Sequence, residues 1–68
     1  MNPIPITANT IYYKLAMSLS SSDPDKSIKE YFMDFLRRNP SRGKDLKIRV
    51  NSYCPKYKYM LDKIMVLL

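Results

Sequence analysis

The sequence predicts a small α+β domain that is mostly α-helical, with an extended arm, a helix, a second helix, a short strand and a third helix, in that order. Three observations lead to this fold class. Long segments space their apolar residues by three and four positions, as one face of a helix requires. One short segment alternates apolar and polar residues, which is typical of a strand. The length of 68 residues allows one domain, so residues 1–68 are assigned to it.

The chain begins with the predicted arm and the first helix. Residues 1–6 alternate two prolines with two isoleucines. Proline fixes φ and lacks a backbone donor, so this segment is expected to be an extended arm or at most an edge strand. A helix is expected over residues 8–20, where Ile11, Leu15 and Leu19 recur every four positions. Its other faces also carry apolar side chains, so it should lie at the centre of the fold or at an interface.

The second helix, over residues 23–38, has the clearest boundaries. Ser22 or Asp23 can cap its start, and Pro24 stands where a missing backbone donor costs nothing. Asn39 and Pro40 end it, because proline cannot continue a helix. The apolar face of this helix consists of Ile28, Tyr31, Phe32, Phe35 and Leu36.

The strand is expected over residues 46–50, after a tight turn at Gly43. Leu46, Ile48 and Val50 alternate with lysine, arginine and asparagine, so the strand would have one apolar and one basic face. A lone strand needs a partner for its backbone donors and acceptors. The arm, a second copy of the chain or the sheet of another protein could supply that partner.

The third helix is expected over residues 56–67, after Pro55 ends the strand. Its apolar residues again follow a spacing of three and four. Taken together, the three helices and the strand predict one core. The predicted core residues are Ile11, Leu15, Leu19, Ile28, Phe32, Phe35, Leu36, Ile48, Leu61 and Ile64.

Charge is distributed unevenly along the chain. Residues 1–36 carry a formal charge of −1 and residues 37–68 carry +7, which gives the net charge of +6. Such asymmetry indicates a polyanionic or acidic partner: nucleic acid, an anionic membrane surface or an acidic protein surface.

A nucleic-acid-binding regulator is the first functional hypothesis. Basic residues would neutralise phosphates from a helix end, a turn and a strand face, and the tyrosines between them could stack on bases. The alternative interpretation is a solvated basic face that keeps the protein soluble. The residues predicted to contact nucleic acid or an acidic partner are Arg37, Arg38, Arg42, Lys44, Lys47, Arg49, Lys56 and Lys58.

A compact inhibitor or adaptor, of the kind that viruses and phages encode, is the second hypothesis. It would dock on a larger acidic protein. A homodimer is also expected, because the strand lacks a partner, the last residues are apolar and the first helix has more apolar residues than one buried face needs. Exposed apolar side chains beside the basic residues would favour this hypothesis over nucleic acid. The predicted interface residues are Tyr12, Tyr13, Met17, Met65 and Leu68.

The composition argues against an enzyme and against a metal site. The chain has one cysteine and no histidine, so it lacks the usual general base and the ligands of a zinc site. No cofactor is expected. Cys54 precedes the third helix and is the sharpest enzymatic candidate, but packing explains it better. A lone cysteine, with no signal peptide and no transmembrane segment, predicts a cytoplasmic or nuclear protein.

Overall fold

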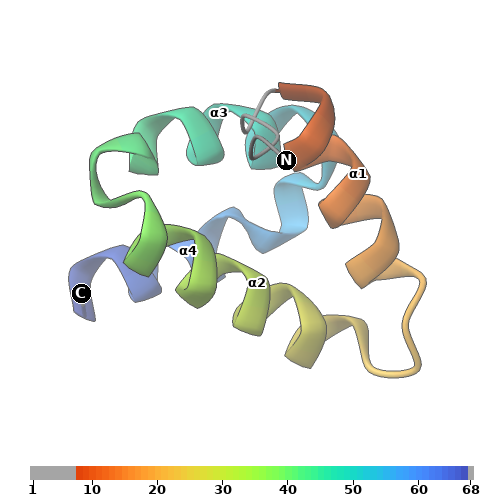
Figure 1. Cartoon of the computed structure of the whole chain (residues 1–68). Helices are drawn as coiled ribbons and strands as arrows, with labels where there is room; N and C mark the ends of the chain where they lie inside the picture. Colours follow the sequence, from red (N-terminus) through yellow and green to blue (C-terminus); the bar gives the residue numbers. More distant parts are fainter. Residues whose placement is uncertain (1–7, 68) are drawn as a thin grey trace.

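The computed structural model describes residues 8–67 and shows a helical protein (Figure 1). Within those residues no strand is present, so the predicted α+β class is wrong and the fold is all-α. The predicted arm, residues 1–6, and Leu68 lie outside the described residues. The elements are α1 (Ala8–Leu19), α2 (Pro24–Arg38), the 3₁₀ turn η1 (Pro40–Arg42), α3 (Gly43–Tyr53), the 3₁₀ turn η2 (Pro55–Tyr57) and α4 (Lys58–Leu67).

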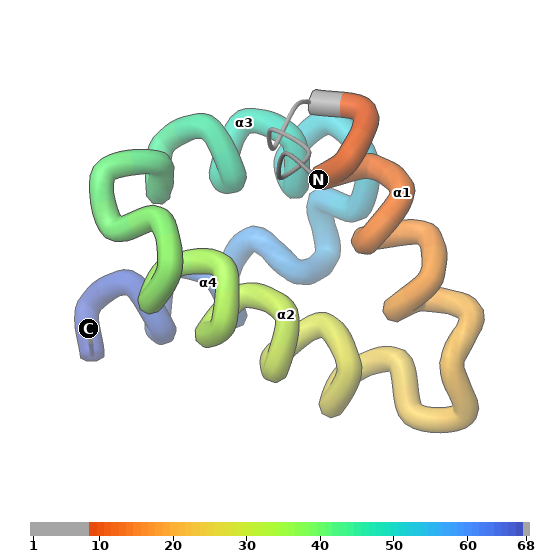
Figure 2. The backbone as a smooth tube through the Cα atoms, viewed as in Figure 1, coloured from red at the N-terminus to blue at the C-terminus, as the bar shows by residue number. Residues whose placement is uncertain are grey.

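The helices pack so that α1 and α4 each contact both α2 and α3. In Figure 1, α1 lies at the right, α2 crosses the front, α3 runs along the top and α4 lies behind α2. The tube in Figure 2 shows the chain reversing after α3 and returning as α4. This reversal places α3 and α4 side by side, with η2 at the turn between them.

The three helices predicted over residues 8–20, 23–38 and 56–67 are confirmed as α1, α2 and α4. The α2 helix shows why its limits were predictable. Asp23 caps the start, because its Oδ1 atom accepts a hydrogen bond of 3.3 Å from the Lys26 backbone N–H.

The segment predicted as a strand is the middle of α3. Leu46, Val50 and Cys54 are all buried, and their spacing of four residues places them on one face of a helix. Ile48 would join them inside if the segment were a strand, but 59% of its surface is exposed. A helix satisfies its backbone donors and acceptors internally, so the partner that a lone strand would have needed is not required.

Gly43 was predicted to form a tight turn, but it is the first residue of α3, with a φ of −58°. The residue is buried. A Cβ atom at this position would lie 3.0 Å from Cε of Met65 and 3.5 Å from Cδ2 of Leu36. The absence of a side chain therefore lets the start of α3 approach α2 and α4 closely.

The core agrees with the prediction for most residues, and the differences lie mainly in α3. Eight of the ten predicted core residues are buried, Leu19 is partly buried and packed against them, and Ile48 is exposed. Four residues that were not predicted complete the core: Leu46, Val50, Cys54 and Tyr57.

Tyr57 links the turn before α4 to the first turn of α2. Its ring is buried, and its hydroxyl donates a hydrogen bond of 2.5 Å to Oδ1 of Asp25. This hydrogen bond, together with burial, raises the pKa of Tyr57 to about 12. The physical reason is that ionisation would remove the donor and place two negative charges side by side.

We expect Tyr57→Phe to lower the free energy of unfolding by about 1–2 kcal/mol, because the Asp25 carboxylate loses its phenol donor. A folded-state pKa raised from 10.0 to about 12 gives stabilisation that is fully present below pH 10 and is lost as the pH rises towards 12. Urea unfolding should therefore show that the wild type loses more free energy of unfolding between about pH 8 and pH 11 than the variant does. Equal losses would contradict the role of this hydrogen bond.

Candidate binding surface

The helix α3 separates the nearby basic residues into two groups. One flank carries Arg49, which shares the carboxylate of Asp45 with Arg42 just before the helix. The guanidinium of Arg42 lies 5.8 Å from the ring centroid of Phe35 in α2. The flank that faces α4 has the spacing i, i+3, i+4 and i+7 and consists of Lys44, Lys47, Ile48 and Asn51.

A groove of about 530 Å³ lies between this flank of α3 and the start of α4. Two large apolar side chains stand exposed in it: Ile48, and Tyr59 with 67% of its surface accessible. Most of the accessible lining is apolar, although lysines surround it. We call this feature the α3–α4 groove; its lining residues are Lys44, Lys47, Ile48, Asn51, Lys58, Tyr59 and Asp62.

The α3–α4 groove is positively charged. Lys47 pairs with Asp62 across it, with 3.2 Å between Nζ and Oδ1. Lys58 lies over the ring of Tyr59, with 5.3 Å from Nζ to the ring centroid. Because Asp62 is the one carboxylate among the described lining residues, the charges of Lys44 and Lys58 remain without compensation inside the groove.

Three of the predicted arginines are held by carboxylates. Arg38 pairs with Asp34 at 3.1 Å on the exposed side of α2. Arg42 and Arg49 both pair with Asp45, at 2.5 Å and 3.5 Å. Each of these contacts offsets part of an arginine's charge and so reduces the charge available to a phosphate.

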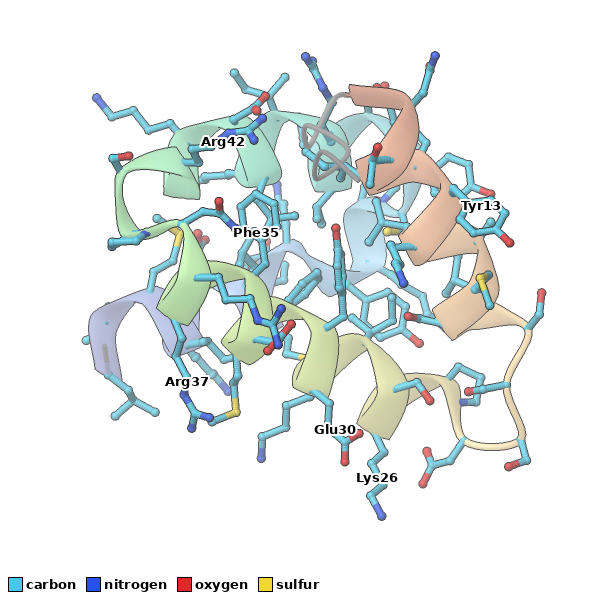
Figure 3. The ribbon with its side chains drawn as sticks, in the orientation of Figure 1. Tyr13, Lys26, Glu30, Phe35, Arg37 and Arg42 are labelled. Carbon is cyan, nitrogen blue, oxygen red and sulfur yellow. The ribbon has the colours of Figure 1, made fainter. Side chains whose placement is uncertain are left out.

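The remaining predicted basic residues do not join the groove. Figure 3 shows Arg42 above α2 and Arg37 below it, so these two arginines lie on different faces. Lys56 belongs to the turn η2 and lies over the ring of Tyr57, with 5.1 Å to the centroid. The structure therefore brings Lys44, Lys47 and Lys58 together and places the other five predicted residues elsewhere.

The predicted interface residues are also divided. Tyr13 and Met17 are exposed on α1, whereas Tyr12 is partly buried with its ring 5.7 Å from that of Tyr53. Met65 is partly buried against the core, and Leu68 lies outside the described residues.

Sequence reasoning missed Ile48 as a surface residue of a site, and it considered Tyr59 only as one of the tyrosines that could stack on bases. Ile48 had been assigned to the core because its segment was interpreted as a strand. The spacing of Lys44, Lys47, Ile48 and Asn51 was the signal that could have found the groove, because it marks one stripe of a helix.

Cys54 does not have the surroundings of a reactive thiol. It is buried at the end of α3, and burial raises its pKa, so the sulfur stays in the less nucleophilic thiol form. Within residues 8–67, no three histidine, cysteine, aspartate or glutamate side chains are grouped as a metal site would need. None of the helices over these residues has the length and apolar character needed to cross a bilayer.

No protein-family model, curated protein or solved structure matches the chain. The α3–α4 groove, its charge and its exposed apolar residues are therefore the basis for a functional assignment.

Proposed function

We propose that the chain is a non-enzymatic adaptor or inhibitor whose α3–α4 groove binds an acidic segment of a larger protein. One observation carries this proposal: Ile48 and Tyr59 are exposed between lysines in a single groove. Lysines attract carboxylates, whereas the apolar side chains gain free energy only if a partner covers them. A partner with both acidic and apolar side chains meets both requirements.

Nucleic acid is the second candidate, and Tyr59 is the observation that favours it. Its exposed ring beside Lys58 could stack on an unpaired base while the lysine contacts a phosphate. Neither the stacked base nor the phosphate in such a complex would cover the exposed side chain of Ile48. Arg38, Arg42 and Arg49 are paired with carboxylates, which reduces the charge they offer to phosphates.

A homodimer and an intracellular compartment remain parts of this proposal. With the strand absent, support for self-association comes from the end of α4, where Val66 and Leu67 are both more than four-fifths exposed. Covering these side chains with a second copy would remove apolar surface from water. A buried, unpaired Cys54 is compatible with a reducing cytosol or nucleus.

We expect Lys44→Ala/Lys58→Ala to weaken the binding of a fluorescent acidic peptide by about three- to thirtyfold at about 50 mM salt, because two exposed ion pairs are lost. The matched control is Lys14→Ala/Lys26→Ala, which removes the same net charge at exposed positions of α1 and α2 outside the groove. Figure 3 shows Lys26 at the lower edge of the molecule, away from α3. Fluorescence anisotropy measures both variants.

The same titration with an oligo-dT strand separates the two candidates. Stronger binding of oligo-dT than of the peptide, lost in the groove variant but kept in the control, would replace the protein partner by nucleic acid. Equal weakening in both double variants would show that only net charge matters and would overturn the proposal. No binding of either ligand would overturn both candidates.

A further inference from the structure

The register of α3 against α4 determines where the groove lysines stand. Lys47 pairs with Asp62, and the buried Gly43 lies next to Met65, so residue numbers rise along α3 as they fall along α4. The two helices are antiparallel, and the same register places Lys58 opposite Asn51, at the end of the groove next to η2. Lys44 stands at the other end.

Three charged positions therefore follow one another along the groove. Lys44 and Lys58 supply uncompensated charge at the two ends, and the Lys47–Asp62 pair lies between them with little net charge. Ile48 and Tyr59 are exposed between the two ends. From the level of Lys44 to that of Asn51 the helix rises seven residues, which is about 10 Å at 1.5 Å per residue.

The wall that α3 presents has the shape of a helix-packing surface. Positions i, i+3, i+4 and i+7 form the stripe along which one helix normally packs against another. Ile48 lies within this stripe and is uncovered, and α4 leaves the groove open beside it. The α3–α4 pair thus offers an unfilled position for a further helix.

We infer that the segment bound in the α3–α4 groove is an amphipathic α-helix with two carboxylates at i and i+7 and apolar side chains at i+3 and i+4. On such a helix the carboxylates are about 10 Å apart on one face, with the apolar side chains between them. This pattern complements Lys44, the exposed pair Ile48 and Tyr59, and Lys58. The inference rests on the proposed function and specifies the partner's conformation and sequence pattern.

An extended segment does not match this arrangement. A strand advances about 3.3 Å per residue, so a separation of about 10 Å corresponds to i and i+3. Those two residues point to opposite faces, because side chains alternate along a strand. An extended partner could therefore not present both carboxylates to the groove at this separation.

Two peptides of identical composition test the inference. The first is an alanine-rich helical peptide with glutamates at i and i+7 and leucines at i+3 and i+4, and the second moves one glutamate to i+5, off the binding face. We expect the first to bind about two- to fivefold more tightly at about 50 mM salt, the effect of one exposed ion pair. In Lys44→Ala/Lys58→Ala this preference should disappear, whereas Lys14→Ala/Lys26→Ala should keep it.

Ile48→Ala tests the apolar contact separately. We expect it to lower the affinity for the first peptide about tenfold, because part of the isoleucine side chain that the peptide would bury is lost. The residue is exposed in the free protein, so the variant should keep its helix content, which circular dichroism checks.

Each other outcome has a definite meaning. Equal affinity for the two peptides, weakened equally by the groove variant, would overturn the helical register while leaving an acidic partner in place. A preference for the first peptide that Ile48→Ala and the lysine variant leave unchanged would place binding outside the groove and overturn the inference. Binding of oligo-dT alone would overturn the inference and the proposed function together.

Discussion

Phe32→Ala is expected to leave the protein largely unfolded at 25 °C. Phe32 is the largest of the fully buried side chains, with none of its surface exposed. Removing a buried aromatic ring costs about 3–5 kcal/mol, through lost transfer free energy and the cavity that remains. A single core in a domain of this size supplies only about 3–5 kcal/mol, so the loss is as large as the whole stability.

Circular dichroism and urea unfolding measure this effect, with Tyr13→Ala as the matched control. Tyr13 is also an aromatic residue on a helix, but 63% of its surface is exposed. We expect its replacement to change the free energy of unfolding by no more than about 0.5 kcal/mol. A folded Phe32→Ala variant with near-native stability would contradict the packing of α2 at the centre of the core.

The sequence predicted α2 well because the signals that form it are local. The Asp23 cap, the proline after it and the Asn39–Pro40 stop are determined within a few residues of each helix end. The apolar stripe from Ile28 to Leu36 covers about two and a half turns at 3.6 residues per turn, and its spacing does not fit the alternation of a strand. Propensity, capping and burial agree along this whole segment.

The sequence prediction failed at α3 because its central segment fits two periods. Leu46, Ile48 and Val50 alternate over five residues, but Leu46, Val50 and Cys54 also recur every four residues. Only a window long enough to include Cys54 distinguishes the two-residue period from the four-residue period. The structure buries the second set and exposes Ile48, which shows that the helical period is the correct one.

The same error obscured the candidate site. Treated as a strand, the segment placed Lys47 and Arg49 on one basic face. As a helix it turns Lys47 towards α4 and Arg49 towards Asp45, so neighbours in the sequence belong to different surfaces. The lysine that completes the groove, Lys58, comes from α4, and only the antiparallel packing of α3 and α4 brings it there.

Leu46→Ala and Ile48→Ala provide the sharpest comparison for this part of the fold. In a strand the two residues would share the apolar face, and the two substitutions would have similar costs. In α3, Leu46 is fully buried and Ile48 is exposed. We expect Leu46→Ala to lower the free energy of unfolding by about 2–5 kcal/mol.

Ile48→Ala should change the same quantity by no more than about 0.5 kcal/mol, because its side chain already lies largely in water. Circular dichroism and urea unfolding of the two variants in parallel give the difference, because a loss at the upper end of this range leaves Leu46→Ala unfolded even without urea. Similar losses of free energy of unfolding for both variants would contradict the helical structure of α3 and, with it, the α3–α4 groove. A large loss for Leu46→Ala alone, with Ile48→Ala stable but weaker in peptide binding, would separate the residue that holds α3 in the core from the residue that α3 offers to a partner.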